Sequence, residues 1–212
     1  MVKNMREAGA VYATQSGKVL LISEMPDDIF AAKVLGDGVC IVPKDGKVFA
    51  PVSGIVESAD DTGHAYGIAS NDGADIMVHI GVDTVELAGR GFKSNVKAGQ
   101  LVNAGDLLCT ADIGKIKKAG YQIHTAVLLC NPGDFDITET AVGKTAQGGQ
   151  TVVFRYTKKK RITLPAASTQ AAGSWVWTRL LNKYPAIFKQ LFKETMSGMI
   201  KTRLWLIFHC LM

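Results

Sequence analysis

The sequence contains no hydrophobic run that approaches the ~18–20 residues needed for a membrane-spanning helix. Residues 1–18 also lack the apolar core of a secretory signal peptide. The four cysteines, Cys40, Cys109, Cys130 and Cys210, are scattered and form no C-x-x-C motif, which predicts free thiols in a reducing compartment. Together these absences predict a cytoplasmic protein without structural disulfides.

Motifs for nucleotide binding and for a self-contained zinc centre are absent as well. Gly36-Asp37-Gly38 is not followed by the G-x-x-x-x-G-K-[ST] pattern of a phosphate-binding loop. No H-E-x-x-H motif places two histidines and a general base on one helix face. We therefore expect no required cofactor.

Charge is distributed unevenly along the chain. The net charge is +5, but residues 161–212 hold seven Lys and Arg against one acidic residue, a net charge of +6. Residues 1–160 are left with a net charge of −1. The basic residues of the C-terminal segment therefore account for the whole-chain pI near 9.0. A nearly neutral main body gives no reason to expect a nucleic-acid partner.

Short β-type segments separated by turn residues dominate the first 160 residues. Many of the 22 glycines lie in such turns, and about ten to twelve short strands can be counted. This spacing is typical of an antiparallel sandwich or barrel. We predict an all-β domain over residues 1–160, with short helical turns near residues 25–31 and 113–119.

The sequence changes character at Lys158-Lys159-Lys160-Arg161. Residues 166–174 resemble a linker, and apolar residues from Trp177 to Leu191 then recur at helical spacing with basic residues between them, interrupted by Pro185. We predict a separate extension over residues 161–212, for which a helix is one alternative. Three hypotheses fit it: an amphipathic anchor in peripheral contact with an anionic membrane, a partner-binding helix, or a non-native extension without a selected role.

Two histidines are predicted to meet across a β-hairpin. His79 lies at the end of the apolar stretch 75–80, and His64 lies upstream, after Gly63. Asn71-Asp72-Gly73 between two β-type segments is a strong hairpin signal. A turn centred on Asp72 would place residue 64 opposite residue 79 to within one residue.

Such a pair suits either of two chemistries. Imidazole binds zinc, but a catalytic zinc normally takes a third protein ligand, and neither Asp83 nor His124 forms an H-E-x-x-H motif with the two histidines. Alternatively, a neutral imidazole can accept a phosphoryl group while a second imidazole donates to the phosphate oxygens. The acceptor would need a partner on its other ring nitrogen, and a backbone carbonyl at Gly81 could supply it.

Four stretches of the sequence resemble the motifs of one known family. They are Met25-Pro26-Asp27-Asp28-Ile29-Phe30-Ala31 through Gly36-Asp37-Gly38, Ala50-Pro51-Val52-Ser53-Gly54, Thr62-Gly63-His64-Ala65-Tyr66, and Val78-His79-Ile80-Gly81-Val82-Asp83-Thr84-Val85-Glu86-Leu87 with Gly89-Arg90-Gly91-Phe92. In these motifs, in their order and in their spacing, the chain resembles the glucose-type IIA components of the bacterial phosphoenolpyruvate-dependent sugar phosphotransferase system. The resemblance covers roughly residues 10–157.

The resemblance implies a phosphotransferase that works through a phosphohistidine. His79 matches the acceptor, which becomes tele-phosphohistidine, His64 matches the histidine that stabilises the phosphoryl group, and Thr62 matches the hydroxyl that orients it. Positions that contact partners are also matched: Asp27, Phe30, Met77 and Asp83. Met77 stands where Phe is common, and residue 63 is Gly where Asn is common.

The same resemblance implies partners. Phosphate would come from the phosphocarrier protein HPr and pass to a cysteine of a IIB domain of a sugar permease. Relatives also regulate metabolic enzymes or transporters, and in some of those complexes zinc is bound between the proteins. Here such zinc would use His64 and His79 with a carboxylate of the partner.

Two other protein classes share local features with this chain. The V-x-A-G-Q and V-x-A-G-D repeats at residues 96–106 also occur in biotinyl and lipoyl carrier domains. Those domains need a modifiable lysine with particular neighbours, which Lys44 and Lys47 lack. A zinc-dependent peptidase of the lysostaphin-like type would need an H-x-H motif together with an H-x-x-x-D motif. No H-x-H motif occurs, since His124 is followed two residues on by Ala126, and His64 is followed four residues on by Ile68 instead of Asp.

Overall fold

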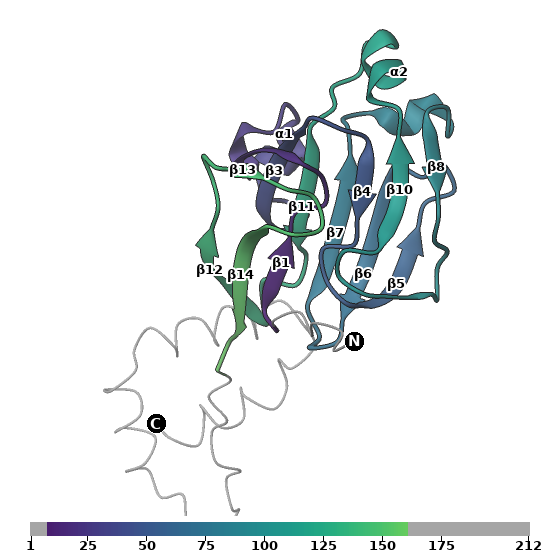
Figure 1. The fold of residues 1–212 in the computed structure, drawn as a ribbon. Coiled ribbons are helices and arrows are strands. Elements are labelled where there is room, and N and C mark those ends of the chain that lie inside the picture. The colour runs from purple at the N-terminus through teal and green to yellow at the C-terminus, as the bar shows by residue number, and fades with distance from the viewer. Residues whose placement is uncertain (1–7, 161–212) are drawn as a thin grey trace, which may run out of the picture. The chain divides into compact units, whose positions relative to one another are not determined.

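The computed structural model describes residues 8–160, which form three antiparallel sheets (Figure 1). The large sheet has the strand order β13-β2-β3-β11-β7-β6-β5-β9. Its strands are Thr145–Ala146, Gly17–Leu21, Asp37–Pro43, Thr125–Leu129, Asp75–Ile80, Ala65–Ser70, Gly54–Ala59 and Leu101–Val102, in that spatial order.

Two three-stranded sheets complete the fold. One has the order β1-β14-β12, with bounds Ala10–Tyr12, Val152–Lys158 and Phe135–Thr140. The other has the order β4-β10-β8, with bounds Lys47–Phe49, Leu107–Ala111 and Phe92–Ser94. Helices are short: α1 Asp28–Ala31, α2 Ile113–Lys118, and the 3-10 helices η1 Ile22–Glu24 and η2 Thr84–Leu87.

The main core lies between the large sheet and the two smaller ones. Val11 of β1, Leu108 of β10 and Val78 of β7 belong to one continuous cluster of buried side chains. Strand β11 is buried along its whole length. Its alternate side chains enter two clusters, Val127 in the main core and Ala126 in a smaller cluster that includes Phe30. Burial of both faces explains why this strand reads as a continuous apolar run.

The hairpin between β6 and β7 has the predicted position and register. Gly73 adopts a left-handed conformation with φ 90° in the turn, and the amide of Ser70 donates to the carbonyl of Ala74 at 2.8 Å. Ala65 pairs with His79 across the two strands. The predicted approach of residues 64 and 79 to within one residue is therefore confirmed.

The all-β antiparallel prediction is confirmed, with fourteen strands among the described residues instead of ten to twelve. The segment Val48–Val56 accounts for part of the difference, because it forms the end of β4 and the start of β5, which belong to different sheets. Pro51 lies between them, and its carbonyl accepts from the amide of Tyr12 at 2.9 Å. Proline has no amide hydrogen for a sheet ladder, so the strand ends here and the chain crosses between sheets.

The predicted extension, residues 161–212, lies outside the described residues, and its boundary and its three hypotheses stay predictions. Within residues 8–160, no helix has the length and apolar character that crossing a membrane would require.

Candidate active site

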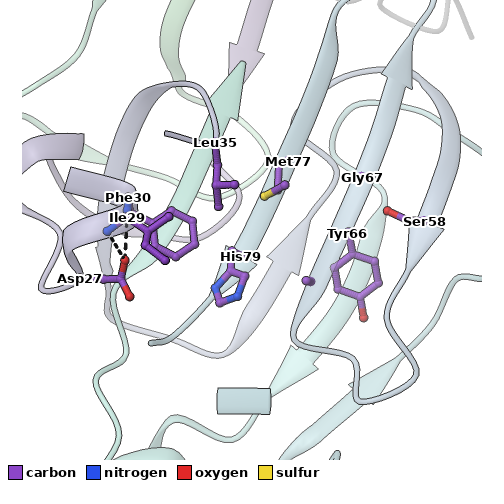
Figure 2. A pocket seen from close by; sticks show the side chains of 10 residues that line it. Asp27, Ile29, Phe30, Leu35, Ser58, Tyr66, Gly67, Met77 and His79 are labelled. Carbon is purple, nitrogen blue, oxygen red and sulfur yellow. Dashed lines mark hydrogen bonds between the residues drawn. The ribbon is translucent and has the colours of Figure 1, made fainter. Parts of the chain in front are cut away.

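His79 projects from the outer face of β7 into a hollow (Figure 2). The strand alternates, with Ile76, Val78 and Ile80 buried and Met77 and His79 half-buried. The neighbours opposite on β6 are small, since Ala65 pairs with His79 and Gly67 with Met77. Small side chains beside the imidazole leave a hollow of about 290 Å³.

The backbone just after β7 fixes the ring of His79. Its Nδ1 lies 3.0 Å from the carbonyl oxygen of Gly81. A carbonyl can only accept, so Nδ1 carries the hydrogen, and the lone pair of the neutral ring is on Nε2. Gly81 adopts φ 80°, and its amide donates to the carbonyl of His124 at 3.0 Å. The predicted contact between the His79 ring and a backbone carbonyl at Gly81 is confirmed.

The surroundings of His79 favour its neutral form. Burial lowers the pKa of His79 below its ordinary value, the nearby imidazole of His64 lowers it further, and the hydrogen bond to Gly81 opposes this only in part. A neutral ring keeps the Nε2 lone pair available, which is what a nitrogen nucleophile requires.

His64 is buried beside His79, with 6% of its surface exposed. The ring centroids are 4.9 Å apart and the planes are nearly perpendicular, at 85°. The carbonyl of His64 accepts from the amide of Ile80 at 2.8 Å, which continues the hairpin ladder. The two histidines that the sequence predicted to meet therefore share one site.

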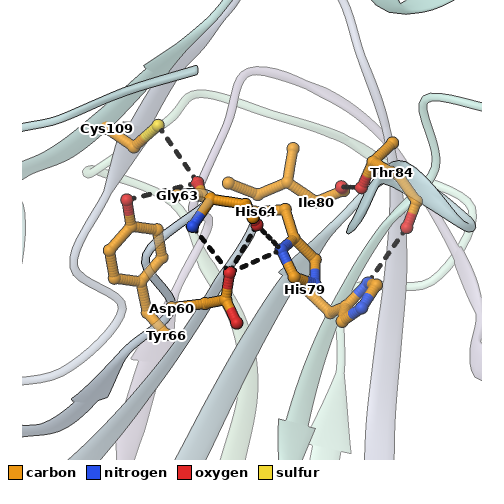
Figure 3. Close-up of polar contacts among 10 residues, drawn as sticks. Asp60, Gly63, His64, Tyr66, His79, Ile80, Thr84 and Cys109 are labelled. Atoms are coloured by element: carbon orange, nitrogen blue, oxygen red, sulfur yellow. Dashed lines mark hydrogen bonds and ion pairs between the residues drawn. The ribbon is translucent and has the colours of Figure 1, made fainter. Parts of the chain in front are cut away.

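A turn before β6 holds His64 through its Nδ1 atom (Figure 3). The hydroxyl oxygen of Thr62 lies 2.5 Å from Nδ1, and Oδ1 of Asp60 lies 3.1 Å from it. Asp60 was not predicted from the sequence. An aspartate two residues before a threonine is a known turn signal, in which the carboxylate accepts the backbone amide two residues on, and here that bond measures 2.8 Å.

Gly63 gives this turn its shape. It has φ 73°, a conformation that Gly and Asn both tolerate. Either Gly or Asn at this position is therefore compatible with the turn. The Gly63 carbonyl accepts from the hydroxyl of Tyr66 at 3.2 Å and from Sγ of Cys109, so the turn is anchored to the core.

Helix α1 borders the hollow on the other side of His79 (Figure 2). Asp27 caps the helix, since its Oδ1 accepts from the amides of Ile29 and Phe30 at 2.9 and 3.0 Å. The ring of Phe30 lies 4.9 Å from the ring of His79. Exposed apolar side chains, Ile29 and Leu35, complete this border. Asp27, Phe30 and Met77 thus all line the hollow, and their contact with partners stays a prediction.

Two other candidate residues, Asp83 and His124, are not among the residues that line the hollow. Asp83 is exposed in a left-handed conformation at the start of η2. The Nδ1 atom of His124 is buried without a hydrogen-bond partner. Among residues 8–160, no group of three or more His, Cys, Asp and Glu side chains is arranged to hold a metal ion. A zinc ion at the two histidines would need further ligands from a partner.

Comparisons with known proteins agree on one family. Residues 9–135 match the family described as phosphoenolpyruvate-dependent sugar phosphotransferase system, EIIA 1. A glucose-specific EIIA component from Bacillus anthracis is 38% identical over 149 residues, which are 70% of this chain and 90% of that protein. The solved structure of glucose permease IIA from Mycoplasma capricolum matches with a TM-score of 0.65 and 38% identity, over 69% of this chain and 94% of that one.

Other relatives contain this domain within longer proteins. A glucose-specific EIICBA component from Streptococcus pneumoniae is 44% identical over 57% of this chain and 17% of its own length. A beta-glucoside-specific EIIBCA component from Dickeya chrysanthemi is 39% identical over 68% of this chain and 24% of its own length. The fold, the profile match and the relatives of similar size lead to the same assignment: the chain belongs to the EIIA 1 family of the phosphoenolpyruvate-dependent sugar phosphotransferase system.

Proposed function

We propose that this chain is a phosphocarrier in which Nε2 of His79 receives a phosphoryl group from phosphorylated HPr and passes it to a cysteine of a IIB domain. The observation that carries the proposal is the hydrogen bond from Nδ1 of His79 to the Gly81 carbonyl, because it leaves Nε2 as the nucleophilic atom. The lowered pKa of His79 supports the same role, since the neutral ring is the reactive form.

His64 supports the transfer from the adjacent strand. Its ring lies edge-on to His79, and its Nδ1 is engaged by Thr62 and Asp60. Nε2 of His64 is then the atom left to donate to the oxygens of a phosphoryl group on His79. A positioned donor of this kind stabilises the negative charge of the transferring group.

The rim of the hollow suits protein partners. Ile29 and Leu35 expose apolar surface next to His79, and apolar patches around a reactive group favour docking of another protein. A IIB partner is supported by relatives whose names join the IIA unit to IIB and IIC units. HPr as the donor, cytoplasmic action, and zinc-assisted complexes with regulated enzymes or transporters rest on the family resemblance.

Phosphorylation with radiolabelled phosphoenolpyruvate, enzyme I and HPr tests the proposal. The wild-type chain should acquire acid-labile, base-stable label, His79→Gln should acquire none, and His64→Gln should still be labelled. His124→Gln is the matched control, because His124 lies outside the hollow, and it should label as the wild type does. Label that persists in His79→Gln would contradict the proposal.

A further inference from the structure

The carboxylate of Asp60 is a charged group at this site to which the proposed transfer has so far given no role. Its Oδ1 receives the amide of Thr62 at 2.8 Å, the hydroxyl of Thr62, and Nδ1 of His64 at 3.1 Å (Figure 3). One oxygen therefore collects three contacts from a single five-residue turn. The pKa of Asp60 is lowered, first of all by the Thr62 hydroxyl, so the group is ionised near neutral pH.

The directions of these hydrogen bonds follow from the ionised carboxylate. A carboxylate only accepts, so the hydroxyl hydrogen of Thr62 points to Asp60. The Thr62 oxygen is then an acceptor for its other neighbour, Nδ1 of His64, at 2.5 Å. Both atoms that contact Nδ1 accept hydrogen, so Nδ1 of His64 must carry one.

This arrangement sets the charge of His64 in the phosphorylated state. With Nδ1 protonated, Nε2 can donate to a phosphoryl oxygen only when it too carries a hydrogen, and a ring with both hydrogens is a cation. We propose that Asp60 is a positioning residue of the phosphoryl site: directly and through Thr62 it holds Nδ1–H of His64, so that His64 faces phosphorylated His79 as a cation with Asp60 as its counter-charge. This inference rests on the proposed function.

Asp27, the other acidic residue beside the two histidines, binds backbone amides. Asp27 has its Oδ1 engaged at the start of α1, on the Phe30 side of His79. Asp60 contacts His64 itself. Nδ1 of His64 therefore faces an anionic carboxylate, whereas Nδ1 of His79 faces a neutral carbonyl.

The transfer balances with these roles. A bond forms between phosphorus and Nε2 of His79, and the bond from phosphorus to the donor nitrogen of phosphorylated HPr breaks, with its electron pair returning to that nitrogen. Nδ1 of His64 keeps its hydrogen, Nε2 of His64 takes up one proton from water as the phosphoryl group arrives, and the hydroxyl hydrogen of Thr62 stays on Thr62. Asp60 touches neither reacting nitrogen and acts only through His64.

Asp60→Asn tests the inference, because the amide keeps an oxygen for the Thr62 turn while it removes the charge. The control is Asp61→Asn, which removes the same charge from an exposed neighbour in the same turn. We expect Asp60→Asn to lower kcat for phosphoryl acceptance from phosphorylated HPr by roughly tenfold, with KM unchanged, since a charge-assisted hydrogen bond is weakened in a partly exposed site. Asp61→Asn should match the wild type in both constants.

Nitrogen-15 chemical shifts of the His64 ring provide a readout that a purely structural role would not move. In the wild type, Nδ1 should be protonated in the free protein and both nitrogens in the phosphorylated protein. In Asp60→Asn the free ring should show Nε2–H at the expense of Nδ1–H. Equal kcat and equal His64 shifts in Asp60→Asn and Asp61→Asn would overturn the inference. A wild type that accepts no phosphate would overturn the proposed function instead, and the free-protein shifts would still decide the role of Asp60.

Discussion

The two histidines differ in what each Nδ1 contacts. Nδ1 of His79 lies against the carbonyl of Gly81, a neutral acceptor. Nδ1 of His64 lies against the hydroxyl of Thr62 and the carboxylate of Asp60. A carboxylate stabilises a positive ring far more than a carbonyl does. In the proposed function, histidine therefore serves as the nucleophile on β7 and as the hydrogen-bond donor just before β6.

The lowered pKa of His79 leads to a prediction for this single residue. Its imidazole should titrate below the ordinary value of 6.5, because burial and the neighbouring His64 both disfavour the charged ring. His64→Gln should raise the pKa of His79, since one of the two causes is removed. NMR titration of the ring hydrogens measures both values, and a pKa of His79 above that of an unfolded control peptide would contradict the prediction.

The same shift links the pH to the free energy of unfolding. Histidine in the unfolded chain binds a proton more readily than His79 in the folded chain does. Its contribution to stability is therefore complete above pH 6.5 and decreases as the pH falls through 6.5 and below. Urea unfolding at a series of pH values should show a smaller decrease for His79→Gln than for the wild type.

At the scale of elements, the turn between β7 and η2 holds the ring of His79 in place. A Cβ atom at Gly81 would lie 2.3 Å from Cγ2 of Thr84 and 2.9 Å from the carbonyl oxygen of Gln122, and φ is 80°. The hydroxyl of Thr84 also donates to the carbonyl of Ile80 at 2.5 Å, so Thr84 is not free to move aside. The carbonyl that orients His79 therefore depends on a residue without a side chain.

Gly81→Ala should destabilise the protein by roughly 3 kcal/mol, from strain and from the clash together, and should reduce phosphorylation of His79. Gly99→Ala is the matched control: its φ is 82°, nearly the same, and a Cβ there would meet nothing within 4 Å. It should cost about 1 kcal/mol and leave labelling intact. Urea unfolding gives the free energies, and equal losses in the two variants would show that the packing at Gly81 has no special role.

Local patterns predicted the elements that carry the site. The Asn71-Asp72-Gly73 turn and the alternation in β7 sufficed to pair the two histidines, because a hairpin depends only on adjacent sequence. The anchor for the turn at Asp60 and the division of Val48–Val56 between two sheets were not predicted. The strand change depends on a contact with the distant Tyr12. Asp60 contacts the nearby Thr62 and His64, and its turn signal was present in the sequence, but that signal does not indicate that the same carboxylate also reaches an imidazole.

At the scale of the whole molecule, the exposed apolar side chains at two separate places allow docking to be tested. Ile29, 54% exposed, lies at the border of the hollow. Leu101, 73% exposed, lies on β9 at the edge of the large sheet. Ile29→Glu should raise KM for phosphorylated HPr roughly tenfold, because a charge must lose its water at an apolar interface. Leu101→Glu should leave KM unchanged, and an equal rise in both variants would exclude a specific docking face at the hollow.

The position of β11 between β3 and β7 also has a consequence for the order of events during folding. The hairpin that brings His64 and His79 together joins neighbouring segments, so it can close quickly. Strand β11, whose Ala126 pairs with His79, comes much later in the chain and must insert between two strands already synthesised. Distant pairings form slowly because a long loop must close first. A nascent chain therefore carries both histidines while β7 is still an open edge, and the ribosome must release residues 125–129 before His79 is enclosed in its sheet.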